Sequence, residues 1–274
     1  MEKEFNNNES EQQVPQNLSE QLCAMYEQLP KREKKSWKSW KDFNAECRLD
    51  MTAPDKPDNS RFNVGGVKIA HEGSIVSVGA TQWYVMADFL VALASVMIGG
   101  RPFGNIEREI PPKKILWVDN SQNKYSISKI MRKVYQLAGI PEDTPFEKVG
   151  LYVLSLQKPF IEERGTIIQE AIDDLNPDVV IIDEVEELLY DYMSVKESYC
   201  VVQWLNRNLE DRTIIVTMRT NDKNRKRGHL GTELGIISSD ELTIIEKGGQ
   251  YEVHHISNGK PIGEKIAFKI DKDG

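Results

Sequence analysis

The feature that most constrains the fold is a series of short apolar runs that alternate with helical patterns. The clearest run, Val179–Asp183, places four apolar side chains in succession before its aspartate. A strand with no polar face must be covered on both sides, which is typical of a parallel sheet between layers of helices. Comparable runs occupy residues 75–78, 114–119, 151–156 and 213–217. The sequence therefore predicts an α/β fold, a three-layer α/β/α core around a mostly parallel sheet.

The segments between these runs repeat apolar residues at helical spacing. Helices are predicted at residues 83–98, 127–138, 161–175 and 195–209. Asp88 interrupts the first of them, which is too short to cross a membrane, so we expect a buried core helix and no membrane contact. After a polar loop at residues 221–231, β-rich pieces at 242–246, 251–256 and 265–270 predict a C-terminal β extension.

Composition divides the chain into three parts. Residues 1–17 are rich in Asn, Gln and Glu, and are predicted to form a disordered tail. Residues 18–60 combine a small helical segment, marked by apolar residues at helical spacing, with a linker at 52–60. Residues 61–274 form the main domain, and the pair Gly65-Gly66 near its start predicts a hairpin or a glycine-broken strand.

The charge balance and the cysteines narrow the setting. The chain has a formal charge of −8, so any attraction to nucleic acid must come from a local basic patch. Its three cysteines, Cys23, Cys47 and Cys200, are far apart and predict neither a disulfide framework nor a metal site. Together with the polar start of the chain, which does not resemble a signal peptide, they favour a cytoplasmic protein.

One local basic patch is the segment at residues 31–41, which has six basic residues and one acidic residue. It interleaves lysines with tryptophans: Lys34, Lys35, Trp37, Lys38 and Trp40. One interpretation is a nucleic-acid patch in which the aromatic rings stack on bases. The other, which we favour, is an amphipathic helix that docks its aromatic side chains on the core and keeps its lysines in water.

Four features lie where predicted parallel strands end, and in such a sheet ligands bind beyond the carboxyl ends of the strands. They are Gly79, Asp119, the pair Asp183-Glu184 and the loop at residues 217–231. The strand, turn and helix around Gly79 have the layout of a phosphate-binding loop. An apolar strand that ends in aspartate, as at Asp183, is typical of a magnesium-supporting carboxylate in phosphate-loop enzymes.

Together these motifs resemble the RecA-like ATPases of bacterial mobile elements and plasmids, which are related to the hexameric helicase RepA. The resemblance extends from residue 65 to the C-terminus and is carried by Gly79, Val179–Asp183 and residues 115–122, 128–140 and 227–234. It implies a RecA-like core and a homo- or hetero-oligomer with RecA-like subunits. The last motif is the most specific, because it is similar to the arginine–glycine segment that such ATPases present to the neighbouring subunit's nucleotide.

The chain departs from that family at three parts of the hydrolysis machinery. Where family members carry Lys and Thr in the phosphate loop, this chain has Val85 and Met86, which cannot donate to phosphate or ligate magnesium. Ser121 stands where related ATPases place a catalytic glutamate, and Met218-Arg219-Thr220 replaces a polar sensor segment. We therefore expect no hydrolysis of ATP at this chain's own site.

What remains of the nucleotide site is interpreted as vestigial. Its members are Gly79, Asp183 and Glu184, together with Asp119 and Ser121. We assign no catalytic residue and no metal there, and binding of ATP with magnesium stays an open alternative. The side chains of residues 83–86, Trp-Tyr-Val-Met, are expected to fill the space that phosphates would occupy.

The loop after residue 217 is the second basic segment and contains Lys223, Arg225, Lys226 and Arg227. Charged loop residues positioned by a rigid sheet favour a role in binding, here of DNA or of a partner subunit. A plain solvated loop is the alternative. Arg227, helped by Arg225, is the candidate for an arginine finger that reaches into the ATP site of an active partner.

Three hypotheses of function follow. The leading one is a catalytically degenerate RecA-like ATPase homologue that acts as a scaffold or regulatory subunit in a mobile-element DNA process, namely replication, mobilisation or transposition. The second is an ATP-binding RecA-like ATPase or helicase subunit with an unusual phosphate loop. The third is a nucleotide-independent DNA-binding protein that uses the two basic segments, a hypothesis that the net charge of −8 disfavours.

Overall fold

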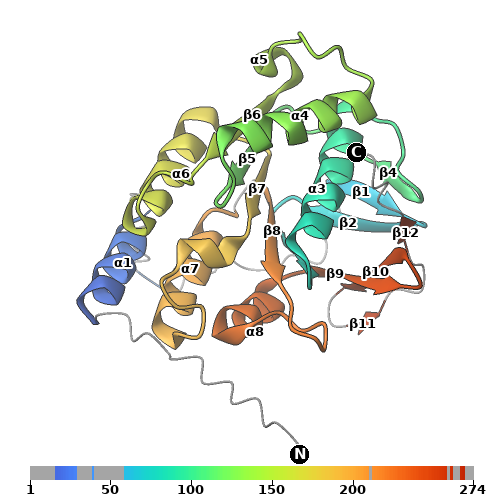
Figure 1. The fold of residues 1–274 in the computed structure, drawn as a ribbon. Coiled ribbons are helices and arrows are strands. Elements are labelled where there is room, and N and C mark those ends of the chain that lie inside the picture. The colour runs from blue at the N-terminus through green and yellow to red at the C-terminus, as the bar shows by residue number, and fades with distance from the viewer. Residues whose placement is uncertain are drawn as a thin grey trace, which may run out of the picture.

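The computed structural model describes residues 16–29, 39, 59–209, 212–257, 260–261 and 266–268 (Figure 1). The predicted tail up to residue 15 and the predicted linker up to residue 58 lie outside these residues. So does the basic segment at 31–41 apart from Ser39, including Lys34, Lys35, Trp37, Lys38 and Trp40.

A nine-stranded sheet forms the centre of the fold. Six neighbouring strands of it, from β9 to the edge strand β6, run parallel to one another. Their order is β9 (Asp240–Lys247), β3 (Ile75–Ala80), β8 (Thr213–Arg219), β7 (Val179–Asp183), β5 (Ile115–Asp119) and β6 (Leu151–Ser155). β3 comes first in the chain yet lies inside the sheet, because later strands are added on both sides of it. The predicted α/β class with a mostly parallel sheet is confirmed.

Antiparallel strands extend the sheet beyond β9. β10 (Gln250–Ser257) pairs with β9 through a hairpin whose turn residues, Gly248 and Gly249, both have positive φ, as a tight hairpin turn requires. β11 (Lys260–Pro261) and β12 (Ile266–Phe268) then pair with β10. The predicted C-terminal β extension is therefore present.

Helices cover both faces of the main sheet (Figure 1). α3 (Trp83–Gly99) and α4 (Lys124–Ala138) bury one face, whereas α1 (Gln16–Gln28), α6 (Ile161–Leu175), α7 (Val195–Arg207) and α8 (Gly228–Ile237) bury the other. In β7, Val179 and Ile181 belong to the first core and Val180 and Ile182 to the second. This division explains the unbroken apolar run, because both faces of the strand are covered.

A small antiparallel sheet packs beside α3. Its order is β2 (Val67–His71), β1 (Ser60–Val64) and β4 (Ile106–Arg108). The turn between β1 and β2 is Gly65-Gly66, with φ values of 57° and 88°, which confirms the predicted hairpin. The sheet buries Phe62 and Ile69 in the same core as α3.

The N-terminal helix α1 is part of the core on the α7 side. The ring of Tyr26 lies 5.4 Å from the ring of Trp204 in α7, and both side chains are buried. Arg207 Nη1, at the end of α7, donates to the carbonyl oxygens of Leu29 at 2.6 Å and Glu27 at 3.2 Å. Because these carbonyls lie at the C-terminal end of α1, the guanidinium satisfies acceptors that the helix leaves free.

Several predicted boundaries differ from the structure, and two of these differences lie near the strand ends. β3 does not stop before Gly79 but continues to Ala80, and the polar loop predicted to reach residue 231 ends where α8 begins at Gly228. The two glycines in the first turn of α8, Gly228 and Gly231, have low helix propensity and hid this helix in the sequence. Tertiary packing decides instead, since Leu230 and Leu234 are fully buried.

Among the described residues, no helix combines the length and the apolar character needed to cross a membrane.

Candidate functional site at the carboxyl ends of the strands

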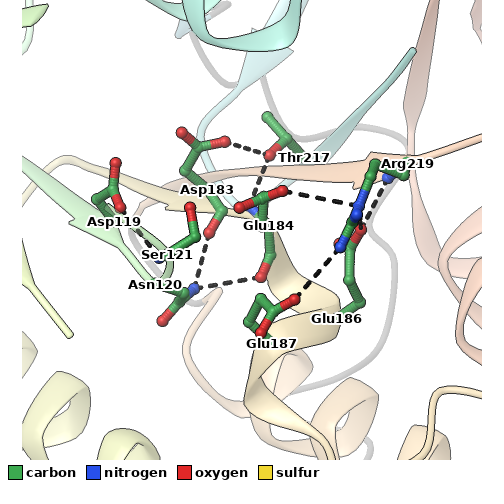
Figure 2. Close-up of polar contacts among 9 residues, drawn as sticks. All are labelled: Asp119, Asn120, Ser121, Asp183, Glu184, Glu186, Glu187, Thr217 and Arg219. Carbon is green, nitrogen blue, oxygen red and sulfur yellow. Dashed lines mark hydrogen bonds and ion pairs between the residues drawn. The ribbon is translucent and has the colours of Figure 1, made fainter. Parts of the chain in front are cut away.

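Four of the five residues predicted at the vestigial nucleotide site meet at one edge of the sheet (Figure 2). β5 and β7 pair in a register that sets Asp119 beside Asp183, so the two aspartates end neighbouring strands. Glu184 follows Asp183 directly in the chain, and Ser121 lies two residues after Asp119. Gly79 lies further away in β3, because β8 separates β3 from β7.

Asp183 is the most perturbed acid at this edge. It is 5% exposed, and burial raises the pKa of its carboxyl from 3.8 to about 8, helped by the negative charges of Asp119, Glu184 and Glu186. The hydroxyl of Thr217 in β8 donates to Asp183 Oδ1 at 2.5 Å and opposes this rise. Because its pKa lies above neutrality, the carboxyl is mostly protonated at pH 7.

The chain turns sharply after Asp183. Glu184 has φ 54° and ψ 65°, in the left-handed region that residues other than glycine, asparagine and aspartate rarely adopt. Its N–H donates to Thr217 Oγ1 at 2.7 Å. The Asn120 amide donates to the carbonyl oxygens of Asp183 at 2.8 Å and Glu184 at 3.4 Å. These hydrogen bonds stabilise a strained backbone conformation. Such strain costs free energy and is common at ligand sites.

Asp119 uses one carboxylate oxygen locally. Its Oδ1 accepts hydrogen bonds from the backbone N–H groups of Ser121 at 3.1 Å and Gln122 at 2.7 Å. These bonds form an Asx-turn after β5. Burial raises the pKa of Asp119, whereas these two bonds lower it. The other oxygen, Oδ2, is buried and has no hydrogen-bond partner among the described residues.

Arg219, at the end of β8, is the counter-charge of this edge. Its Nε lies 3.3 Å from Glu186 Oε1 and 3.7 Å from Glu184 Oε1, and its Nη2 lies 3.3 Å from Glu187 Oε1 (Figure 2). The sequence indicated this arginine only as a departure from a polar sensor segment. It did not indicate Glu186 and Glu187 as members of the site. The acidic run of residues 184–187 directly after a buried strand was the signal that could have identified them.

The connection after Gly79 is too short for a phosphate loop. β3 ends at Ala80 and α3 begins at Trp83, so only Thr81 and Gln82 join them. In the phosphate-loop pattern, four residues separate two glycines before the lysine, and their backbone N–H groups surround the phosphates. Helix α3 here begins before that loop could be completed.

Close packing explains Gly79 itself. A Cβ added at this position would lie 2.8 Å from Thr220 Cγ2, closer than carbon atoms pack, and Thr220 is fully buried. Gly79 is absent from the residues with positive φ, so no unusual backbone conformation requires the glycine. The residue therefore has a packing role that holds without any ligand.

The expectation for residues 83–86 is half wrong. Val85 and Met86 are buried in the core, but Trp83 and Tyr84 are 50% and 41% exposed. Because successive helix residues point about 100° apart, only part of the four-residue run can face the sheet. The two aromatic rings therefore lie at the surface and do not fill a phosphate-sized space.

An open cleft of about 460 Å³ lies beside this edge. It is lined by polar side chains, among them Asn120, Ser121, Glu184, Glu187 and Arg219, and by the half-exposed Trp83. Arg164 of α6 also lines it and donates through Nη1 to the Glu187 carbonyl oxygen at 2.7 Å. Both arginines thus already have acceptors within the protein.

The basic loop after β8 separates into exposed and buried members. Lys223, Arg225 and Arg227 are exposed, and in the described part of the chain no carboxylate lies within 4.0 Å of them. Lys226 instead pairs with Glu241 of β9 at 2.8 Å, and its side chain is only 6% exposed. Lys226 was predicted to bind nucleic acid or a partner, but the structure gives it an internal ion pair.

Replacing Gly79 by alanine should destabilise the fold by about 1–3 kcal/mol, because the new methyl group overlaps Thr220. The second substitution Thr220→Ser removes the overlapping Cγ2 and should recover most of that loss in the G79A background. Urea unfolding of the wild type, both single variants and the double variant measures the effect. If the double variant is no more stable than G79A, packing against Thr220 is not the reason for the glycine.

Within the described ranges, no group of three or more His, Cys, Asp or Glu side chains is arranged to hold a metal ion. No protein-family model matches the sequence. No curated protein matches it at a significant level.

Proposed function

We propose that the protein is a RecA-like subunit that does not hydrolyse ATP and acts as a scaffold or regulatory subunit in a DNA process of a mobile genetic element. The proposal combines the motif resemblance with the geometry of the strand ends. The two-residue connection between β3 and α3 is the observation that carries it, because a nucleotide's phosphates have no loop to bind them there.

The strand order supports the first half of this proposal. In open α/β sheets, ligands bind at a point where the strand order reverses, outside the carboxyl ends. β3 is such a point, since the chain leaves it toward β5 and later adds β8 and β9 on its two sides. Gly79 lies near the end of this strand, and Asp119 and Asp183 end two other strands of the same parallel set, an arrangement that supports the proposed RecA-like ancestry.

The side chains support the second half, the loss of hydrolysis. At the position of the phosphate-loop lysine, α3 presents the buried Val85. Burial raises the pKa of Asp183, so a magnesium ion would have to displace a proton in order to bind there. Arg219 is paired with three glutamates, so its charge is not available to phosphate oxygens. The residues present at this edge therefore do not fit ATP with magnesium.

The basic loop supports a partner-binding role. Arg225 and Arg227 are exposed on a loop that the rigid strand β8 positions, and Gly228 follows with φ 65° at the start of α8. A Cβ at Gly228 would lie 2.5 Å from the Tyr192 carbonyl oxygen, so close packing against Tyr192 requires a glycine in the arginine–glycine motif. A rigid base with exposed guanidinium groups suits contact with another subunit.

Titration calorimetry with ATP and magnesium, together with a phosphate-release assay, tests the loss of the nucleotide site. We expect no binding heat and no hydrolysis above the protein-free rate. The exposed Asp143 provides a matched control, because Asp143→Ala removes a carboxylate that lines neither the cleft at the strand ends nor the one beside the β3–α3 turn. Millimolar or tighter binding that Asp183→Ala abolishes and Asp143→Ala preserves would instead support an ATP-binding subunit with an unusual phosphate loop.

A further inference from the structure

The three cysteines are far apart in the sequence, but the fold brings two of them together. Cys23 lies in α1 and Cys200 in α7, and their thiols are hydrogen-bond partners. Both are free thiols, and they are 1% and 4% exposed. Cys47 lies outside the described residues. The spacing of the cysteines predicted no disulfide framework, whereas the packing of α1 on α7 places one pair within reach of a bond.

Two further contacts show how α1 lies against α7 (Figure 1). One turn after the cysteines, the rings of Tyr26 and Trp204 pack with their centres 5.4 Å apart. One turn further, Arg207 Nη1 donates to the Leu29 carbonyl oxygen at 2.6 Å. The contacts advance from residue 23 to 26 to 29 along α1 and from 200 to 204 to 207 along α7. The two helices therefore run parallel with matched turns, and the cysteines face each other at the first of these turns.

This arrangement meets the geometric requirement for a disulfide. Two cysteines can be bridged without backbone movement only when their Cβ atoms point toward each other from neighbouring segments. Facing turns of packed helices satisfy that condition, and thiols that already share a hydrogen bond need only rotate about χ1 to approach bonding distance. No rearrangement of α1 or α7 is required once the helices are docked.

Burial decides when the pair can react. It raises the pKa of Cys23 to about 12 and also raises that of Cys200, although the hydrogen bond with Cys23 lowers the latter. The thiolate is the reactive form, so both thiols are inert while α1 is docked. α1 has 13 residues and lies at the edge of its core, so it can open locally while the sheet stays folded. Opening exposes the thiols, and closing returns the two sulfurs to contact.

We propose that Cys23 and Cys200 form a reversible disulfide that holds α1 on α7 under oxidising conditions, and that reduction leaves the helix free to open. The oxidant is a small-molecule disulfide, such as oxidised glutathione. When α1 opens, the Cys200 thiolate attacks one sulfur of the oxidant, forms a mixed disulfide and expels one thiolate. When α1 closes, the Cys23 thiolate attacks Cys200 Sγ, forms the S–S bond and expels the second. Two protein thiols lose two electrons and two protons, which convert one small disulfide into two thiols.

The consequence concerns the N-terminal part of the chain. α1 directly precedes the basic segment at residues 31–41, and in the reduced protein packing and the Arg207 hydrogen bonds hold this helix. A disulfide between residues so distant in sequence adds a covalent restraint that strongly restricts the unfolded chain. The attachment of the basic segment is therefore fixed in the oxidised protein and able to open in the reduced protein. This device does not depend on whether the strand-end site binds ATP.

Equilibration of the full-length protein with glutathione buffers of increasing oxidised fraction tests the proposal. After the remaining thiols are alkylated, proteolysis without reductant and mass spectrometry identify the linked peptides. We expect a disulfide between Cys23 and Cys200 of one chain as the main product, which dithiothreitol should reverse. Cys47→Ser is the control and should preserve this product, whereas Cys200→Ser should abolish it. Mixed disulfides that never resolve, or Cys23 and Cys200 thiols that remain alkylated in oxidising buffer, would overturn the proposal.

Hydrogen exchange tests whether the disulfide holds α1. Amides of α1 should exchange about tenfold or more slowly in the oxidised wild type than in the reduced wild type. Arg207→Ala removes the hydrogen bonds to the α1 carbonyls, so α1 should open more often and the disulfide should form about tenfold faster. Circular dichroism checks that R207A is folded. Equal exchange of α1 in the two redox states, or oxidation that R207A does not accelerate, would contradict a disulfide gated by this helix.

Discussion

Asp183→Asn is expected to stabilise the protein at pH 8 by about 2–4 kcal/mol, although it removes the aspartate that resembles a magnesium ligand. The reason is the cost of burying a carboxyl whose pKa is raised from 3.8 to about 8. Asparagine carries no charge, and its oxygen can still accept the hydrogen bond from the Thr217 hydroxyl. Its new N–H donors would face the nearby acids Asp119 and Glu184.

The pH dependence gives this prediction its sign. Between pH 3.8 and about 8, the unfolded chain releases the Asp183 proton while the folded chain keeps it. The contribution of this group to the free energy of unfolding is therefore full below pH 3.8 and is lost as pH rises toward 8. The advantage of D183N should accordingly be small at acidic pH and grow across this window.

Urea unfolding of wild type and D183N at several pH values measures this difference. Asp222→Asn is the matched control, because Asp222 is exposed and its replacement should change little at any pH. A D183N protein that is less stable than wild type at pH 8, or a difference that does not grow with pH, would show that the ionised carboxylate stabilises the fold. That outcome would support the alternative in which Asp183 is ionised and can bind a cation.

Trp204→Ala should cost about 3–5 kcal/mol of stability, the range for truncating a buried aromatic residue. Trp204 is 1% exposed, packs against Tyr26 of α1 and donates through Nε1 to Gln169 Oε1 at 2.9 Å. Its removal leaves a cavity between α1, α6 and α7 and takes a donor from a buried amide. The loss should loosen α1, whose end is held by the neighbouring Arg207.

Thermal and urea unfolding measure the overall loss, and hydrogen exchange of α1 measures whether this helix opens first. Tyr26→Phe is the matched control, because it keeps the ring and removes only the hydroxyl that donates to the Leu188 carbonyl oxygen at 3.3 Å. We expect that control to lose about 1 kcal/mol. A W204A protein within that range of wild type would mean that α1 docks without support from α7.

Much of the fold could be predicted because its signals are local. β7 and α6 were predicted with the bounds that the structure shows, since β7 is a short run rich in β-branched residues and α6 is a longer periodic segment that ends at a turn signal. α8 was missed for the opposite reason. Its glycines oppose a helix, and only the burial of Leu230 and Leu234 against distant elements stabilises it.

The candidate site was predictable in position but not in character. Asp119 and Asp183 end buried strands, and parallel strands bring such ends to one edge. The pairing of Arg219 with Glu184, Glu186 and Glu187 depends on β8 lying next to β7, which no local pattern specifies. For the same reason Lys226 looked like a member of a basic patch, although it pairs with Glu241 in a different strand.

The sequence by itself therefore determined the α/β class, most helices and strands, and the absence of a phosphate-loop lysine at Val85. Only the tertiary structure decided that two residues join β3 to α3, that Gly79 makes room for Thr220, and that the thiols of Cys23 and Cys200 meet between α1 and α7. The physical reason is the sequence separation over which each interaction acts. Apolar periodicity acts between neighbours in the chain, whereas burial, ion pairing and close contact are set by strands and helices that are distant in sequence.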